Sequence, residues 1–444
     1  MNNCVRLAIA VLMGLIVMTS AGTTCLAAGS ASLAEENAQL KQRLEKLEGE
    51  VEELKKTAPL SSASGPRTAG ETPATRLPVW SSLDIQLYGY LKLDAAYDDS
   101  RIDNGNYAKW VERENANSND DQFNMTANET RLGMLINGPD DPILKASGRV
   151  EVDFYGSGDA ENKAHLMMRH AYMKLDWPAD RFSIIAGQTS DVISPLLPST
   201  VNYTVGWWTG NIGYRRPQFR LTKEYGLDAQ TDLKLEGALA RTIGRDNTSL
   251  AGTTDSGEDA GFPTLQARAG LSLPLLGSKR SDVGLSGHWG QEEYDTTTGG
   301  RNEEFTSWSL NLDFTQPVNK WLSVKSEVFT GENLDAYLGG IGQGVTTTGA
   351  SLNEEIGSKG GWIAAALGPW DKARFNVGIG MDDVDRGNVN AGDRTLNHSV
   401  FGNVYYSLAK NTEWAFELSH WRTEYRGSGD ADSLRAQTAL IYKF

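Results

Sequence analysis

Charged residues recur at alternate positions between apolar neighbours in several segments of this chain. Five of them are arginines and two are acids: Arg131, Arg149, Arg169, Arg220, Arg268, Glu151 and Asp153. A guanidinium stays protonated and pairs well with carboxylates. Rows of mixed charge across a water-filled channel also create a transverse field that orients dipolar solutes. We therefore expect these residues to line a pore. The alternative is that they only keep a channel hydrated and pair with one another.

Other spacings that could support catalysis or metal binding are absent from the sequence. None of the five histidines belongs to an H-E-x-x-H pattern, and there is no G-x-S-x-G or P-loop motif. The acidic stretch 382–388 has some likeness to a calcium loop but lacks the later glutamate, so a solvated acidic loop is the better interpretation. We expect no catalytic residue, no metal site and no cofactor.

The N-terminus has the features of an export signal. Arg6 precedes the apolar run Leu7 to Met18, and small residues follow, which predicts a secretory signal peptide over residues 1–28. The residues before Cys25 do not fit a lipoprotein signal. Cys4 and Cys25 both lie in this signal, so the mature chain would have no thiol for disulfides, metal binding or nucleophilic chemistry. The net charge of -15 argues against a nucleic-acid partner.

Residues 30–56 have a heptad repeat, which predicts a periplasmic α-helical coiled coil. The a and d positions form one seam: Leu33, Asn37, Leu40, Leu44, Leu47, Val51 and Leu54. The charged residues that flank this seam would attract one another in a parallel, in-register assembly. Asn37 would fix the register, but these residues do not choose between two and three helices. Residues 57–80 are rich in Ser, Ala, Thr, Gly and Pro and predict a flexible linker.

From residue 81 to residue 444 the apolar period changes to two. Apolar residues alternate with polar ones along 84–94 and again along 144–155. Long polar stretches also alternate with short turns, eight against seven, which implies about 16 antiparallel strands. Short turns on one side and long loops on the other are typical of a transmembrane antiparallel β-barrel. The fold class is therefore all-β, with the N-terminal coiled coil in front of the barrel.

The third long loop, residues 190–215, contains features that suit a constriction. Trp207 and Trp208 are adjacent, and Arg215 and Arg216 follow at the return of the loop. Exposing two adjacent tryptophans to water is unfavourable, so we expect this loop to fold into the barrel and narrow it. Alternatively, the tryptophans could lie at a subunit contact or at the outer membrane interface.

Several segments of the chain resemble one known family. They are Ile85-Gln-Leu-Tyr-Gly-Tyr, Arg169-His-Ala-Tyr, Gly187-Gln, Gly210-Asn-Ile-Gly-Tyr-Arg-Arg-Pro-Gln, Phe401-Gly-Asn-Val-Tyr and the terminal Phe444. Together with the order of signal, coiled coil, linker and barrel, they are similar to the DcaP-like trimeric outer-membrane porins. The resemblance implies a trimer of 16-stranded barrels that passes small polar, often anionic, solutes.

We therefore expect an outer-membrane porin for passive diffusion of small hydrophilic solutes, with a preference for anions or dicarboxylates. Its partners would be two further copies of the chain in a homotrimer, together with outer-membrane lipid and lipopolysaccharide. The N-terminal segment would lie in the periplasm, where the coiled coil could reach the cell wall. A structural tether between outer membrane and cell wall is the alternative function. A barrel-based lipid hydrolase lacks any supporting motif.

Overall fold

The computed structural model describes residues 83–113, 120–156, 164–244, 255–276, 279–295, 302–348 and 351–444. The predicted signal peptide, coiled coil and linker lie outside these residues, so the seam from Leu33 to Leu54 and the proposed domain boundaries stay predictions. No helix of the described residues is long and apolar enough to span a membrane.

Most of the described chain consists of β-strands. In chain order they are β1 Asp84–Asp98, β2 Ile102–Asn104, β3 Ala108–Val111, β4 Gln122–Thr126, β5 Arg131–Asn137, β6 Lys145–Gly156, β7 His165–Trp177, β8 Phe182–Ser190, β9 Arg215–Gly226, β10 Asp232–Ala240, β11 Thr264–Leu276, β12 Lys279–Asp295, β13 Asn302–Pro317, β14 Leu322–Glu332, β15 Val345–Thr348, β16 Ser351–Glu355, β17 Gly357–Trp370, β18 Ala373–Val384, β19 Arg394–Ala409, β20 Thr412–Tyr425 and β21 Ala431–Lys443. Two short 3-10 helices, η3 Asp335–Tyr337 and η4 Gly340–Gly342, lie between β14 and β15.

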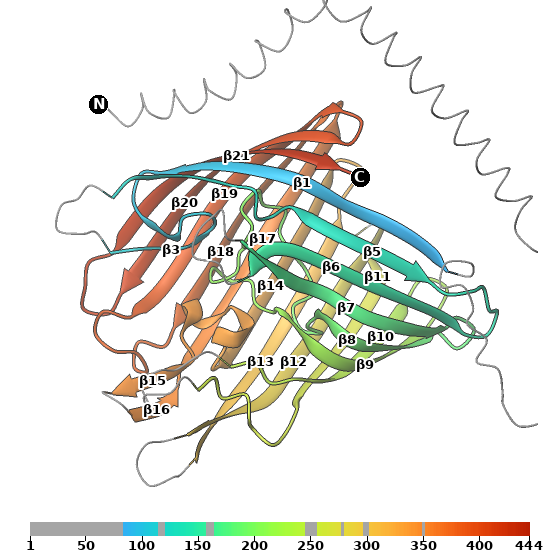
Figure 1. The fold of residues 1–444 in the computed structure, drawn as a ribbon, viewed down its shortest axis with the longest axis horizontal. Coiled ribbons are helices and arrows are strands. Elements are labelled where there is room, and N and C mark those ends of the chain that lie inside the picture. Colours follow the sequence, from blue (N-terminus) through green and yellow to red (C-terminus); the bar gives the residue numbers. More distant parts are fainter. Residues whose placement is uncertain are drawn as a thin grey trace, which may run out of the picture. The chain divides into compact units, whose positions relative to one another are not determined.

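Seventeen of these strands form one antiparallel sheet that closes on itself. The first strand pairs with the last, from Tyr90 opposite Lys443 to Asp98 opposite Arg435, and Figure 1 shows blue β1 beside red β21. Strands β4 and β5 pair with successive parts of β1 and together fill one position of the ring. The ring therefore has sixteen positions, which confirms the all-β barrel with about 16 strands.

In the barrel, apolar side chains are exposed and polar side chains are buried, which is the reverse of their distribution in a soluble protein. Leu87 and Phe123 on the outer face are 74% and 64% exposed. Along β20, buried Glu413, Glu417 and Ser419 alternate with more exposed neighbours. Apolar side chains outside and polar ones inside are what a strand needs when lipid lies on one side and water on the other.

Long and short connections lie at opposite ends of the strands. Seven connections are short, namely those after β5, β7, β9, β11, β13, β17 and β19. All the long connections are among those that follow β1, β6, β8, β10, β12, β14, β18 and β20. Trp321 and Trp370 lie at the short-turn end, where their rings stack with centroids 6.3 Å apart. The first long connection differs from the expected loop, because residues 122–126 continue the barrel as β4, and β2 and β3 form a separate hairpin.

Candidate functional site

The third long connection, residues 191–214 (loop 3), leaves the barrel wall after β8 and reaches the strands on the far side. The backbone N–H of Leu196 donates to Glu327 Oε1 of β14 at 2.8 Å. The N–H of Val201 donates to Glu417 Oε2 of β20 at 2.7 Å. Asn403 of β19 donates to the carbonyl of Ser199 at 2.8 Å. Loop 3 therefore crosses the interior of the barrel and is tied to the opposite wall.

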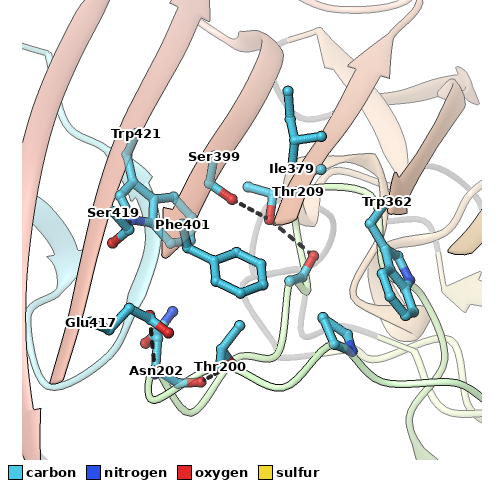
Figure 2. Close-up of a pocket in the computed structure, with 13 residues that line it drawn as sticks. Thr200, Asn202, Thr209, Trp362, Ile379, Ser399, Phe401, Glu417, Ser419 and Trp421 are labelled. Atoms are coloured by element: carbon cyan, nitrogen blue, oxygen red, sulfur yellow. Dashed lines mark hydrogen bonds between the residues drawn. The ribbon is translucent and has the colours of Figure 1, made fainter. Parts of the chain in front are cut away.

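The tie between loop 3 and that wall leaves little free space. Figure 2 shows a small cavity lined by Thr200, Asn202 and Thr209 of loop 3 and by Glu417 and Ser399 of the wall, with Thr209 hydrogen-bonded to Ser399. The cavity has a volume of about 20 Å³, enough for about one water molecule. Because Glu327 and Glu417 are each only 2% exposed, the acids of this wall are covered by the loop.

The predicted constriction residues of loop 3 lie inside the barrel, in contact with other loops. Trp207 is 6% exposed and packs edge-on against Tyr214, with ring centroids 5.6 Å apart. Trp208 packs edge-on against Trp110 of β3 at 6.2 Å. The two tryptophans thus contribute to a cluster of loops rather than to an exposed loop tip.

Loops 1 and 6 also fold inward, whereas the sequence predicted this only for the third loop. Val111 of loop 1 (residues 99–121) donates its N–H to Thr423 of β20 at 2.9 Å. Loop 6, residues 333–356, meets loop 3 where the N–H of Trp208 donates to the carbonyl of Leu338 at 2.9 Å. Apolar residues within these polar loops were the sequence feature that could have predicted the inward folds. Ile102 in loop 1 and Leu334 in loop 6 are such residues, and both are fully buried in the structure.

Three of the predicted pore-lining arginines gather around two acids on neighbouring strands β5, β6 and β7. Arg169 bonds to both acids, to Glu151 at 2.8 Å and to Asp153 at 2.7 Å. Arg149 contacts Glu151 at 2.6 Å and Arg131 lies 3.6 Å from the same carboxylate. The guanidinium-bearing side chains of Arg149 and Arg131 are 31% and 22% exposed, whereas both acids are almost fully buried. The accessible surface of this cluster is therefore cationic.

Aromatic side chains join this arginine cluster to loops 1 and 3. Tyr203 of loop 3 donates to Asp153 at 3.2 Å and packs against Tyr155 with centroids 4.2 Å apart. Tyr107 of loop 1 lies edge-on to Tyr155 at 5.1 Å. Burial raises the pKa of Tyr107 to about 12, so its hydroxyl stays neutral at physiological pH. Loop 3 thus contacts both sides of the barrel interior.

The other two predicted arginines form a second cluster on strands β9, β10 and β11. Arg268 bonds to Asp313 at 2.7 Å and lies 3.5 Å from Glu236. Arg220 lies 3.8 Å from the same Glu236, and Lys234 lies 3.0 Å from it. Three cations again share two acids, as in the first cluster.

Arg215 and Arg216, at the return of loop 3, have different surroundings. Both are buried, at 5% and 1% exposed, and Arg216 pairs with Asp191 at 2.7 Å. Arg215 lies over Tyr214 at 4.5 Å and over Trp207 at 5.7 Å. Its Nε and Nη2 atoms have no hydrogen-bond partner among the described residues. Arg215 is thus a cation held by aromatic faces rather than by a carboxylate of the described chain.

The remaining candidate chemistry does not assemble into a site. No group of three or more His, Cys, Asp or Glu side chains in the described ranges is arranged to hold a metal. In the acidic stretch 382–388, Asp382 accepts from the N–H of Ile341 at 3.2 Å, while Asp385 accepts from that of Gly387 at 2.9 Å. The two carboxylates therefore accept hydrogen bonds from the backbones of two different loops.

A closed barrel with an apolar exterior, a charged interior and an infolded third loop defines an outer-membrane porin. The model of the DcaP outer membrane protein family matches residues 23–243. The chain belongs to this family, which confirms the resemblance seen in its motifs. The barrel therefore lies in the outer membrane and forms a channel.

Solved structures share this fold at low sequence identity. The outer membrane channel DcaP of Acinetobacter baumannii is 21% identical with a TM-score of 0.65, over 82% of this chain and 98% of that chain. An anion-selective porin from Comamonas acidovorans is 12% identical with a TM-score of 0.51, over 82% of this chain and 100% of that chain. OmpF of Salmonella typhi, in a complex with daunomycin, is 11% identical with a TM-score of 0.51, over 81% of this chain and 97% of that chain. No curated protein sequence matches the chain.

Proposed function

We propose that this porin passes small hydrophilic solutes by passive diffusion and prefers anions, dicarboxylates among them. The observation that carries the proposal is the cluster on β5, β6 and β7, where Arg131, Arg149 and Arg169 make ion-pair contacts with two acids of the described chain, Glu151 and Asp153. The surplus charge is positive and lies on the accessible side chains. Confined guanidinium groups attract anions and pair well with carboxylates.

The distribution of acidic side chains in the barrel also supports a preference for anions. Loop 3 covers Glu327 and Glu417 on its far side, and both acids accept hydrogen bonds from its backbone. Solutes would pass on the other side of loop 3, along the arginine-bearing strands. Arg215 adds a cation without a carboxylate partner in the described chain. The overall charge of -15 therefore does not predict the charge of the path.

Reversal potential across a salt gradient in planar bilayers tests the proposal directly. The wild-type protein should give an anion-selective potential, and Arg149→Gln should move it toward zero. Arg422→Gln is a matched control, because Arg422 lies on the outer-face parity of β20 and pairs with Asp432 at 3.4 Å. Cation selectivity of the wild-type channel would overturn the anion preference.

The homotrimer, the lipopolysaccharide contact and the periplasmic N-terminus are proposals of the same kind. The family and the neighbouring folds, one of them the trimer form of OmpT from Vibrio cholerae, support a trimer. A detergent-extracted mass of one chain would contradict an oligomer. The tether function would depend on residues 30–56, which lie outside the described residues.

A further inference from the structure

A buried ion pair joins the two ends of loop 3. Asp191 begins the loop and Arg216 follows its end, and their side chains, each 1% exposed, lie 2.7 Å apart. The same carboxylate accepts from the backbone N–H of Tyr214 at 2.8 Å and from Gln266 at 2.7 Å. A charge buried in this way is strongly held, because breaking the pair would leave an uncompensated ion.

Arg216 also holds a residue of loop 6. Its guanidinium carbon lies 3.9 Å from the ring centroid of Tyr337 in η3. The ring of His288 of β12 stacks on Tyr337 with centroids 3.9 Å apart and an interplanar angle of 27°. Two groups this close cannot share one face of a ring, so Tyr337 is sandwiched between Arg216 and His288. The histidine is itself fixed by Ser309 at 2.7 Å and Ser307 at 3.0 Å.

The backbones of loops 3 and 6 are joined beside this sandwich. Gly213 donates its N–H to the carbonyl of Tyr337 at 2.8 Å, and Trp208 donates to that of Leu338 at 2.9 Å. Trp208 and Leu338 both have left-handed backbones, with φ of 64° and 62°. Such conformations are unfavourable for large side chains and persist only where the surroundings impose them, typically at functional sites.

We propose that Arg216 is a positioning residue: through the ring of Tyr337 it clamps loop 6 onto loop 3, and the two loops together set the width of the channel. Arg216 therefore acts on permeation without facing the solute. The proposal rests on the channel function and is independent of the sign of the ion preference.

Single-channel conductance, open-channel noise and the largest neutral polyethylene glycol that enters the pore test this clamp in the full-length protein. Tyr337→Leu leaves the Arg216–Asp191 pair in place and removes the ring. Without the ring, loop 6 should move away from loop 3, which should raise the open-channel noise and the size limit for polyethylene glycol. Conductance should increase on the order of twofold, because it follows the open cross-section of the channel. Arg216→Lys should give the same effects more weakly, because an ammonium keeps the charge but loses the planar stack.

Matched variants separate the clamp from a general loss of structure. Tyr406→Leu makes the same change on the outer face, where Tyr406 is 38% exposed, and should leave conductance and noise unchanged. Tyr337→Leu combined with Arg216→Lys should add little to Tyr337→Leu alone, because both act through one contact. Should Tyr337→Leu fail to give a folded barrel, His288→Gln removes one face of the sandwich and should raise the noise and size limit in the same direction.

Folded Tyr337→Leu or His288→Gln channels with wild-type conductance, noise and size limit would overturn the clamp, and so would a fall in conductance. A wild-type channel without anion preference would contradict the proposed selectivity and leave the clamp test intact. Wild-type protein that forms no channel at all would contradict both proposals.

Discussion

Glu417 of β20 accepts a hydrogen bond of 2.7 Å from the backbone N–H of Val201 in loop 3. The bond joins residues 216 positions apart in the chain, and the carboxylate is almost fully buried. A carboxylate on the wall thus satisfies a backbone donor of a loop that has no strand partner at that point. Glu327 does the same for Leu196, so loop 3 is latched at two places.

Removing the first latch should loosen loop 3. Glu417→Leu would leave buried N–H groups without an acceptor, at a cost of about 1–3 kcal/mol each. We expect a lower thermal unfolding temperature and noisier single-channel currents. Glu417→Gln keeps an acceptor oxygen and should stay closer to wild type. Equal behaviour of the Leu and Gln variants would show that the carboxylate does not latch the loop.

Arg215 and Arg216 should affect selectivity in different ways. Arg215→Ala removes a cation without a carboxylate partner in the described chain, so the reversal potential should become less anion-selective. Arg215→Lys keeps the charge and is the matched control. An unchanged potential in Arg215→Ala would remove this residue from the selectivity site. Arg216→Lys should change conductance noise while it leaves the sign of the potential unaltered.

The face of each strand can be tested by thiol labelling during conduction. The two cysteines of the chain, Cys4 and Cys25, both lie in the predicted signal, so a single introduced cysteine would be the only thiol after cleavage. Modification of Arg149→Cys by a bulky anionic thiol reagent should lower the conductance. The neighbouring Val150→Cys, on the outer face at 41% exposure, should show no change. Block at Val150→Cys would mean that the two faces of β6 are exchanged.

A charge on the outer face should destabilise the barrel in lipid. Leu285 of β12 is 53% exposed and lies opposite Leu312 of β13, whose side chain also points outward. Leu285→Arg should cost about 2–4 kcal/mol if it lies near the bilayer midplane. Denaturant unfolding in liposomes measures the difference, with Leu285→Phe as an apolar control. A neutral Leu285→Arg would place this part of β12 outside the hydrocarbon region.

Strand order and loop lengths were already readable in the sequence because both are local properties. The alternation along 84–94 corresponds to β1, and that along 144–155 corresponds to β6. Polar and apolar positions of a strand must alternate when its two faces meet different solvents. The family motifs are likewise short and local. These features required no knowledge of distant contacts.

The contents of the lumen were decided only by the tertiary structure. Arg215 and Arg216 are adjacent and identical in type, yet one lies against aromatic rings and the other pairs with Asp191 and holds Tyr337. The inward folds of loops 1 and 6 likewise depend on partners far along the chain, such as Thr423 for Val111. A loop's path is set by which buried donors and acceptors it can satisfy across the barrel, and periodicity along the chain carries no record of those pairings.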